Sequence, residues 1–140
     1  MKRIIFALIA LLAITMSVSA QMKKIKVLID NDFCGDPDGL FVLLQHALLP
    51  TTEIVGIVSG HLNENAGFTN RKDQATESVE KTNDLLDAMG MKGKFKVVPG
   101  SETLMTCSDK IIGSEGSKLI VEEVKNVLQR NFFMCCAELH

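Results

Sequence analysis

The sequence predicts an α/β protein with a parallel sheet covered by helices. Short runs of β-branched and aliphatic residues alternate three times with longer apolar or amphipathic segments. Each longer segment has the length of a helix that can cross a sheet and return the chain to the same edge, as parallel strands require. With 140 residues, the chain fits one small domain.

The elements follow from local patterns along the chain. Strands are predicted where apolar runs are short and β-branched, and helices where apolar residues recur at helical spacing or exceed the length of a strand. The predicted strands are 24–30, 53–60, 94–100 and 131–136. The predicted helices are 38–49, 75–89 and 118–129, with Pro50 and Gly90 ending the first two and Ser114 or Ser117 capping the third.

The first twenty residues have the pattern of a secretory signal peptide. Lys2 and Arg3 precede an apolar run, and Val18-Ser19-Ala20 supplies the small residues expected at a cleavage site. The apolar run is shorter than the roughly 20 residues that span a bilayer comfortably, although a retained anchor is the alternative. We expect residues 1–20 to be removed and residues 21–140 to be exported, periplasmic or secreted, without membrane attachment.

Composition excludes several classes of partner and site. Without Lys2 and Arg3 the formal charge of −2 becomes −4, and the chain has no Trp or Tyr, so we expect no nucleic acid polymer as a partner. The four cysteines show no CxxC or Cys/His zinc spacing, and their positions argue against a disulfide framework. The sequence leaves open the redox state of the cysteines and whether the chain forms a homo-oligomer.

Four aspartates, Asp30, Asp32, Asp36 and Asp38, stand between the first predicted strand and the first predicted helix. Ligands of parallel α/β sheets bind outside the carboxyl ends of the strands, where Asp30 and Asp32 are placed. Asp36 before Pro37 also has the pattern of a helix N-cap with proline at the first helical position, and Asp38 would favour the helix dipole. Capping needs only one or two carboxylates, so a hard divalent cation such as Ca²⁺ explains the cluster better.

The stretch "KVLIDNDFCGDPDGLFVLLQHALLP" resembles the opening of the inosine-uridine-preferring nucleoside hydrolase family, whose signature is a strand followed by DxDPGxDD and a helix. The likeness continues through "EIVGIVSGH", "ATESVEKTNDLLDAMG" and "KVVPGSE", and covers nearly all of residues 24–102. The resemblance implies a Rossmann-like parallel sheet with flanking helices, here an incomplete nucleoside hydrolase fold. It also implies Ca²⁺-dependent hydrolysis of the N-glycosidic bond of ribonucleosides, with a small nucleoside or ribose as the partner.

The resemblance assigns a role to each aspartate. Asp32 matches a metal ligand and general base, Asp38 matches a metal ligand, and Asp30 matches a metal-site residue that helps to order the site. Asp36 matches a ribose-binding carboxylate, and His61 stands near the position where the family often has an Asn for the ribose. One extra residue lies between Asp32 and Asp38, so the roles of Asp36 and Asp38 could be exchanged.

Two other functions remain open. Asp30-x-Asp32 after an apolar strand is similar to the nucleophile and acid/base pair of HAD-like phosphatases, although Cys34 stands where Thr or Val is expected. The other is a non-catalytic remnant or ribose-binding module. Because the sequence has no counterpart of the family's late metal-ligating Asp and leaving-base His, we expect the chain to be truncated after "NFFMCCAELH" and to have little or no hydrolase activity.

Overall fold

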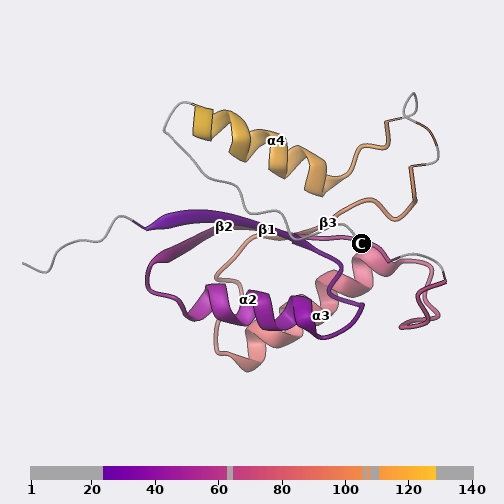
Figure 1. Cartoon of the computed structure of the whole chain (residues 1–140), viewed down its shortest axis with the longest axis horizontal. Coiled ribbons are helices and arrows are strands. Elements are labelled where there is room, and N and C mark those ends of the chain that lie inside the picture. The colour runs from indigo at the N-terminus through magenta and orange to yellow at the C-terminus, as the bar shows by residue number, and fades with distance from the viewer. Residues whose placement is uncertain (1–23, 63–64, 106, 108–110, 129–140) are drawn as a thin grey trace, which may run out of the picture.

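The computed structural model describes residues 24–62, 65–105, 107 and 111–128, in which strands and helices alternate (Figure 1). The elements are β1 (Ile25–Asn31), α2 (Asp38–Leu48), β2 (Thr52–Ser59), α3 (Gln74–Ala88), β3 (Val97–Pro99) and α4 (Glu115–Leu128). Within these ranges, no helix combines the length and the apolar character needed to cross a membrane. The predicted signal peptide and the predicted strand 131–136 lie outside the described residues.

The strands form one parallel sheet in the order β1-β2-β3. Asn31 at the end of β1 lies opposite Ser59, and Ser59 in turn lies opposite Pro99. Helices α2 and α3 cover one face of the sheet, and α4 covers the other (Figure 1). The predicted α/β fold, a Rossmann-like parallel sheet with flanking helices, is confirmed at this level.

The hydrophobic core has two parts because side chains of a strand alternate between the two faces of the sheet. On the face of α2 and α3, the buried residues are Val27, Ile29, Phe33, Leu43, Ile57 and Leu86. On the face of α4, they are Leu28, Val58, Val98 and Leu119. Both faces of the strands are covered, which explains why the strand sequences are continuously apolar.

The element boundaries follow from local signals, with β3 as the exception. Helix α3 ends before Gly90, which has a φ of 69° that favours glycine. At the start of α4, Ser117 N donates to Ser114 Oγ (3.0 Å) and Ser114 N donates to Ser117 Oγ (2.9 Å), so both predicted capping residues contribute. Strand β3 is shorter than the predicted 94–100 because a turn, in which Lys94 N donates to Met91 O, occupies the start of that range.

A glycine allows α4 to lie close to β2 and β3. A Cβ atom added at Gly116 would overlap Val58 Cγ1 and would lie 3.2 Å from both Gly100 Cα and Pro99 O. Because two of these three atoms belong to the backbone, the surroundings cannot move away without shifting a strand end. The contact therefore holds the N-terminus of α4 beside the carboxyl end of the sheet.

We predict that Gly116→Ala destabilises the protein by about 1–3 kcal/mol, because the added methyl group overpacks this contact. The matched control is Gly113→Ala, since an added Cβ there meets nothing within 4 Å. The free energy of unfolding, measured by urea denaturation, should fall for Gly116→Ala and stay close to wild type for Gly113→Ala. Equal stability of the two variants would contradict the described packing of α4.

Candidate functional site

The carboxyl ends of the strands and the N-termini of the helices meet at one edge of the sheet (Figure 1). Gly60 N donates to Asn31 O and Gly100 N donates to Ser59 O, each at 2.8 Å. The loops that follow the three strands therefore begin at the same level of the sheet. Ligands of open parallel α/β sheets bind outside this edge. A ligand-binding site of this fold is therefore expected at this edge.

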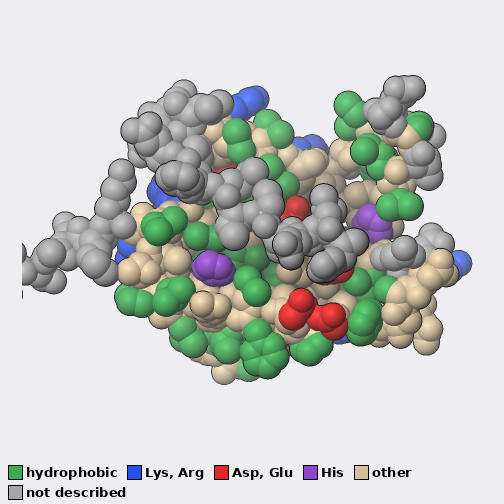
Figure 2. Space-filling view, viewed as in Figure 1, with side chains coloured by type: hydrophobic (Ala, Val, Ile, Leu, Met, Phe, Trp, Pro, Cys, Tyr) green, Lys and Arg blue, Asp and Glu red, His purple; other side chains and the backbone are tan. Residues whose placement is uncertain are grey.

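The four predicted aspartates all lie at this edge. Asp30 is near the end of β1, Asp32 follows the strand, and Asp36 and Asp38 stand on either side of Pro37 where α2 begins. All four residues are exposed. Figure 2 shows acidic side chains gathered on the surface at the beginning of α2, with hydrophobic side chains beside them.

The environment of two of the four aspartates, Asp30 and Asp38, raises the pKa of their carboxyl groups. Desolvation by the protein atoms around its carboxyl group raises the pKa of Asp30, even though the residue as a whole is exposed, and the negative charge of Asp32 raises it further. The pKa of Asp38 is raised chiefly by its hydrogen bond with the carboxyl group of Asp36, while the Gly39 N–H, which donates to Asp38 Oδ1 at 2.7 Å, acts in the opposite direction. The charge of Asp32 also raises the pKa of Asp38.

These raised pKa values have a defined effect on stability. When the pKa of a carboxyl group is higher in the folded than in the unfolded chain, the folded chain binds more protons in the pH range between the two values. The resulting stabilisation is present at acid pH and is lost as the pH rises through the folded pKa. At neutral pH, ionised Asp30 and Asp38 therefore oppose folding, and a bound cation would relieve this cost.

The start of α2 differs by one residue from the prediction. Phe41 N donates to Pro37 O (3.2 Å), so Pro37 occupies the N-cap position that was predicted for Asp36. Asp36 nevertheless accepts a hydrogen bond at the helix start, from Asp38 N to Asp36 Oδ1 at 3.2 Å. Asp36 thus helps to fix the turn but does not begin the helix.

Buried residues anchor the aspartate loop, residues 32–37, from the inside. Cys34 is fully buried, and its backbone N–H donates to Ser78 Oγ of α3 at 3.0 Å. The Ser78 hydroxyl group in turn donates to Gly60 O at 3.0 Å, so one side chain joins the loops that follow β1 and β2. Lys81 Nζ donates to Cys34 O at 3.3 Å. Burial also raises the pKa of the Cys34 thiol, which keeps it protonated.

Ser78 was missed by the sequence analysis, although a signal for it exists. The face of α3 that packs against the sheet carries Ser78 and Thr82 where an ordinary core helix would have larger apolar residues. Thr82 Oγ1 donates to Ser78 O at 2.8 Å and lies 3.3 Å from Ser59 Oγ. Small hydroxyl residues at helical spacing on a buried face indicate contacts with backbone groups, because buried polar groups need hydrogen-bond partners.

The N-termini of α3 and α4 are also occupied by groups of the chain itself. Glu102, in the loop after β3, accepts hydrogen bonds from Ala75 N (2.8 Å) and Thr76 N (2.9 Å) at the start of α3. Ser114 and Ser117 cap α4 in the same way. This role of Glu102 was not predicted from the sequence. Helix N-termini attract anions, so these caps reduce the capacity of the edge to bind a phosphate group.

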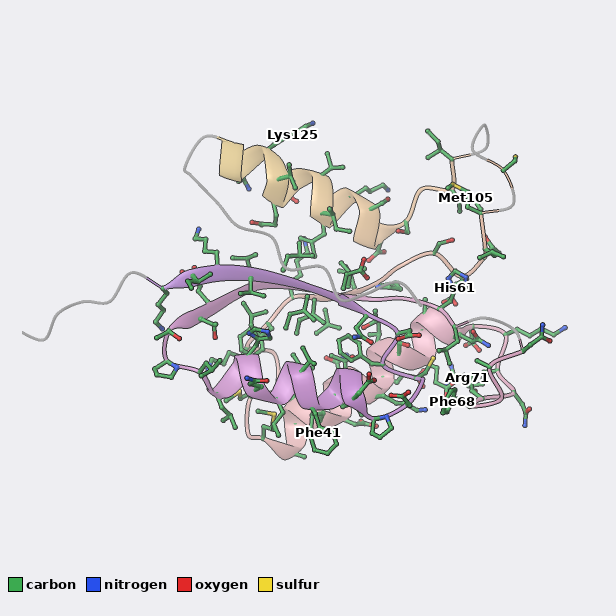
Figure 3. The ribbon with its side chains drawn as sticks, in the orientation of Figure 1. Phe41, His61, Phe68, Arg71, Met105 and Lys125 are labelled. Carbon is green, nitrogen blue, oxygen red and sulfur yellow. The ribbon has the colours of Figure 1, made fainter. Side chains whose placement is uncertain are left out.

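His61 lies two residues beyond the end of β2 and is half-buried. Figure 3 shows it between the end of the sheet and the loop that carries Met105. The structure thus places His61 at the same edge of the sheet as the aspartates.

The described residues include no group of three or more His, Cys, Asp or Glu side chains that could hold a metal ion as they stand. Among the aspartates, Asp38 N donates to Asp36 Oδ1, and the charge of Asp32 acts on both Asp30 and Asp38. The described cysteines, Cys34 and Cys107, are free thiols. Comparisons of the chain with models of protein families, with curated proteins and with solved structures found no match.

We predict that Ser78→Ala destabilises the protein by about 1–3 kcal/mol, because it leaves the buried Cys34 N–H and Gly60 C=O without their partner. Thr103→Ala is the control, since Thr103 is exposed and only its backbone groups take part in the described hydrogen bonds. Urea denaturation measures both free energies of unfolding. A Ser78→Ala variant as stable as Thr103→Ala would show that Ser78 does not anchor the aspartate loop.

Proposed function

We propose that the aspartate edge is a Ca²⁺ and ribose site of the nucleoside hydrolase type. The observation that carries the proposal is the placement of four exposed aspartates at the carboxyl edge of a parallel sheet, where their environment raises the pKa of Asp30 and Asp38. Such an arrangement costs stability unless a positive charge offsets it. Perturbed carboxylates at a ligand-binding edge are typical of functional sites.

The donor chemistry fits Ca²⁺. The ion prefers carboxylate and carbonyl oxygens and accepts variable geometry, and the edge offers Asp30, Asp32 and Asp38 as ligands. Because the described side chains form no group that could hold a metal ion as they stand, ion binding must draw Asp32 and Asp38 toward a common point. Both side chains are exposed, so no core contact opposes this movement.

The residues of the site would then have separate roles in cleavage of the N-glycosidic bond. A bound Ca²⁺ would lower the pKa of its water. Asp32 would take the proton of the attacking water as general base while the C–O bond to that water forms and the C–N bond to the base breaks, and the departing base would take a proton from solvent. The negative charges of the loop would stabilise the positive charge that develops on the ribose in the transition state. Asp36 and His61 hold the ribose hydroxyl groups. Binding and turnover are separate parts of this proposal and are tested separately.

One observation favours a nucleoside over a phosphate ester as the ligand. A HAD-like phosphatase that used Asp30 and Asp32 would need groups at the same edge to receive the phosphate. The N-termini of α3 and α4 are capped by Glu102 and by Ser114 with Ser117, and α2 begins with aspartates. These groups repel phosphate or occupy its place, whereas neutral ribose hydroxyl groups meet no such penalty.

Calorimetry tests the metal site directly. We predict that the wild-type chain binds Ca²⁺ and that Asp32→Ala weakens binding by about tenfold or more, because one charged ligand is lost. The control is Asp84→Ala, which removes an exposed carboxylate from α3 at a distance in sequence from the aspartate loop. No heat of binding, or equal affinity in all three proteins, would defeat the proposed site.

Turnover is measured by release of reducing sugar from inosine or uridine in the presence of Ca²⁺. Sugar release that is lost in Asp32→Ala supports a hydrolase. Binding of Ca²⁺ without sugar release supports a non-catalytic ribose-binding or metal-binding module. Release of phosphate from p-nitrophenyl phosphate with Mg²⁺ would overturn the nucleoside proposal in favour of a phosphatase.

A further inference from the structure

Asn31 is the last residue of β1, and its side chain lies on the face of the sheet that α2 covers. Side chains alternate between the two faces along a strand, and Val27 and Ile29 of the same strand belong to the core beneath α2 and α3. Asn31 continues this row toward the carboxyl edge. A half-buried amide therefore takes the next place in a row of apolar side chains.

The side chain of Asn31 lies against the backbone of Gly39, in the first turn of α2. A Cβ atom added at Gly39 would lie 2.5 Å from Asn31 Oδ1 and 2.8 Å from Asn31 Cγ. The glycine is buried, so the amide fills the space that a side chain at position 39 would take. The two residues together set the distance between the end of β1 and the start of α2.

Both partners of this contact are also held by hydrogen bonds at the carboxyl edge. Asn31 O accepts from Gly60 N at 2.8 Å, which fixes the backbone of Asn31 to the end of β2. Gly39 N donates to Asp38 Oδ1 at 2.7 Å. A continuous set of contacts thus runs from β2 through Asn31 and Gly39 to the carboxyl group of Asp38.

The amide suits this position for a physical reason. A Val or Leu would continue the apolar row and bury more hydrophobic surface, whereas partial burial of a polar group costs free energy. An Asp would add a further negative charge to an edge that already carries four aspartates. Asn has the shape of Asp without the charge, and its amide both donates and accepts hydrogen bonds. A polar residue where core packing favours an apolar one indicates a role other than core packing.

We propose that Asn31 is a positioning residue for Asp38. Its side chain, packed on Gly39, fixes the backbone from which the carboxyl group of Asp38 extends. The consequence for a cation rests on the proposed function. With the start of α2 held in place, Asp38 needs only to rotate its side chain to reach an ion that Asp32 also binds. Replacing residues that hold metal ligands in place commonly weakens metal binding by about 10–100-fold.

Calorimetry with Ca²⁺ compares the wild type, Asn31→Ala, Gly39→Ala and the variant that combines both substitutions. Asn31→Ala leaves a gap beside Gly39, and Gly39→Ala brings a methyl group into the amide of Asn31, so each single variant should bind Ca²⁺ about tenfold more weakly. In the combined variant the added methyl group occupies part of the vacated space, and affinity should recover to within about threefold of the wild type.

Leu86→Val is the control for a general loss of stability. Leu86 is a core residue near the end of α3, so this variant loosens the core far from the N-terminus of that helix and should bind Ca²⁺ like the wild type. Single variants that bind Ca²⁺ as tightly as the wild type, or a combined variant that recovers no affinity, would overturn the role of Asn31.

The χ1 rotamers of Asp38, followed by NMR three-bond couplings in the metal-free protein, give a second measurement that does not depend on Ca²⁺. The side chain should keep one rotamer in the wild type and in Leu86→Val, and it should populate at least two in Asn31→Ala, because the Gly39 N–H is no longer held in place. Equal rotamer populations in the wild type and Asn31→Ala would overturn the proposal whether or not the proteins bind Ca²⁺. A wild type that binds no Ca²⁺ would remove the proposed cation site and leave the couplings to decide the role of Asn31.

Discussion

The parallel pairing of β1 with β2 is the constraint on which the rest of the structure depends. Asn31 lies opposite Ser59, and the hydrogen bond from Gly60 N to Asn31 O ends the ladder where the two loops begin. Because the strands are parallel, each must be followed by a helix that returns the chain, and every loop after a strand emerges at the same edge. The aspartate loop, Ser78 and Glu102 meet there for this reason. An antiparallel pair would have placed the first two loops at opposite ends of the sheet.

The two sides of the aspartate loop have opposite effects on stability. The contacts on its buried side stabilise the fold, whereas the carboxylates on its exposed side oppose folding when they are ionised. Buried Cys34 and Ser78 tie the loop to α3, while on the exposed side a neighbouring carboxylate helps to raise the pKa of both Asp30 and Asp38. A loop that only turned the chain and started α2 would not need four aspartates, because Pro37 O accepts the first helical bond. Ionisable groups with perturbed pKa values are found most often at functional sites, where they bind a ligand or take part in a reaction. A bound cation would account for the crowded carboxylates in this way.

The elements could be predicted from the sequence because their signals are local: apolar runs mark the strands, and Gly90 marks the end of α3. The position of the aspartates at the sheet edge also followed, since any residue after a parallel strand lies there. The anchoring contacts could not be predicted in the same way. Cys34 and Ser78 are 44 residues apart, and Glu102 reaches back 26 residues to Thr76, so no local pattern contains these pairs. The relative positions of the four carboxyl groups depend on loop geometry, which residue spacing alone does not determine.

The central claim is that the aspartates form a cation site, and the pKa values of their carboxyl groups test it most directly. Each aspartate can be followed by carbon NMR through a pH titration, first without divalent cations and then with Ca²⁺. The account predicts that the pKa values of Asp30 and Asp38 lie above the ordinary range in the metal-free protein and fall when Ca²⁺ is present, because a bound cation favours the ionised form. Ordinary pKa values without Ca²⁺, or values that Ca²⁺ does not change, would contradict it.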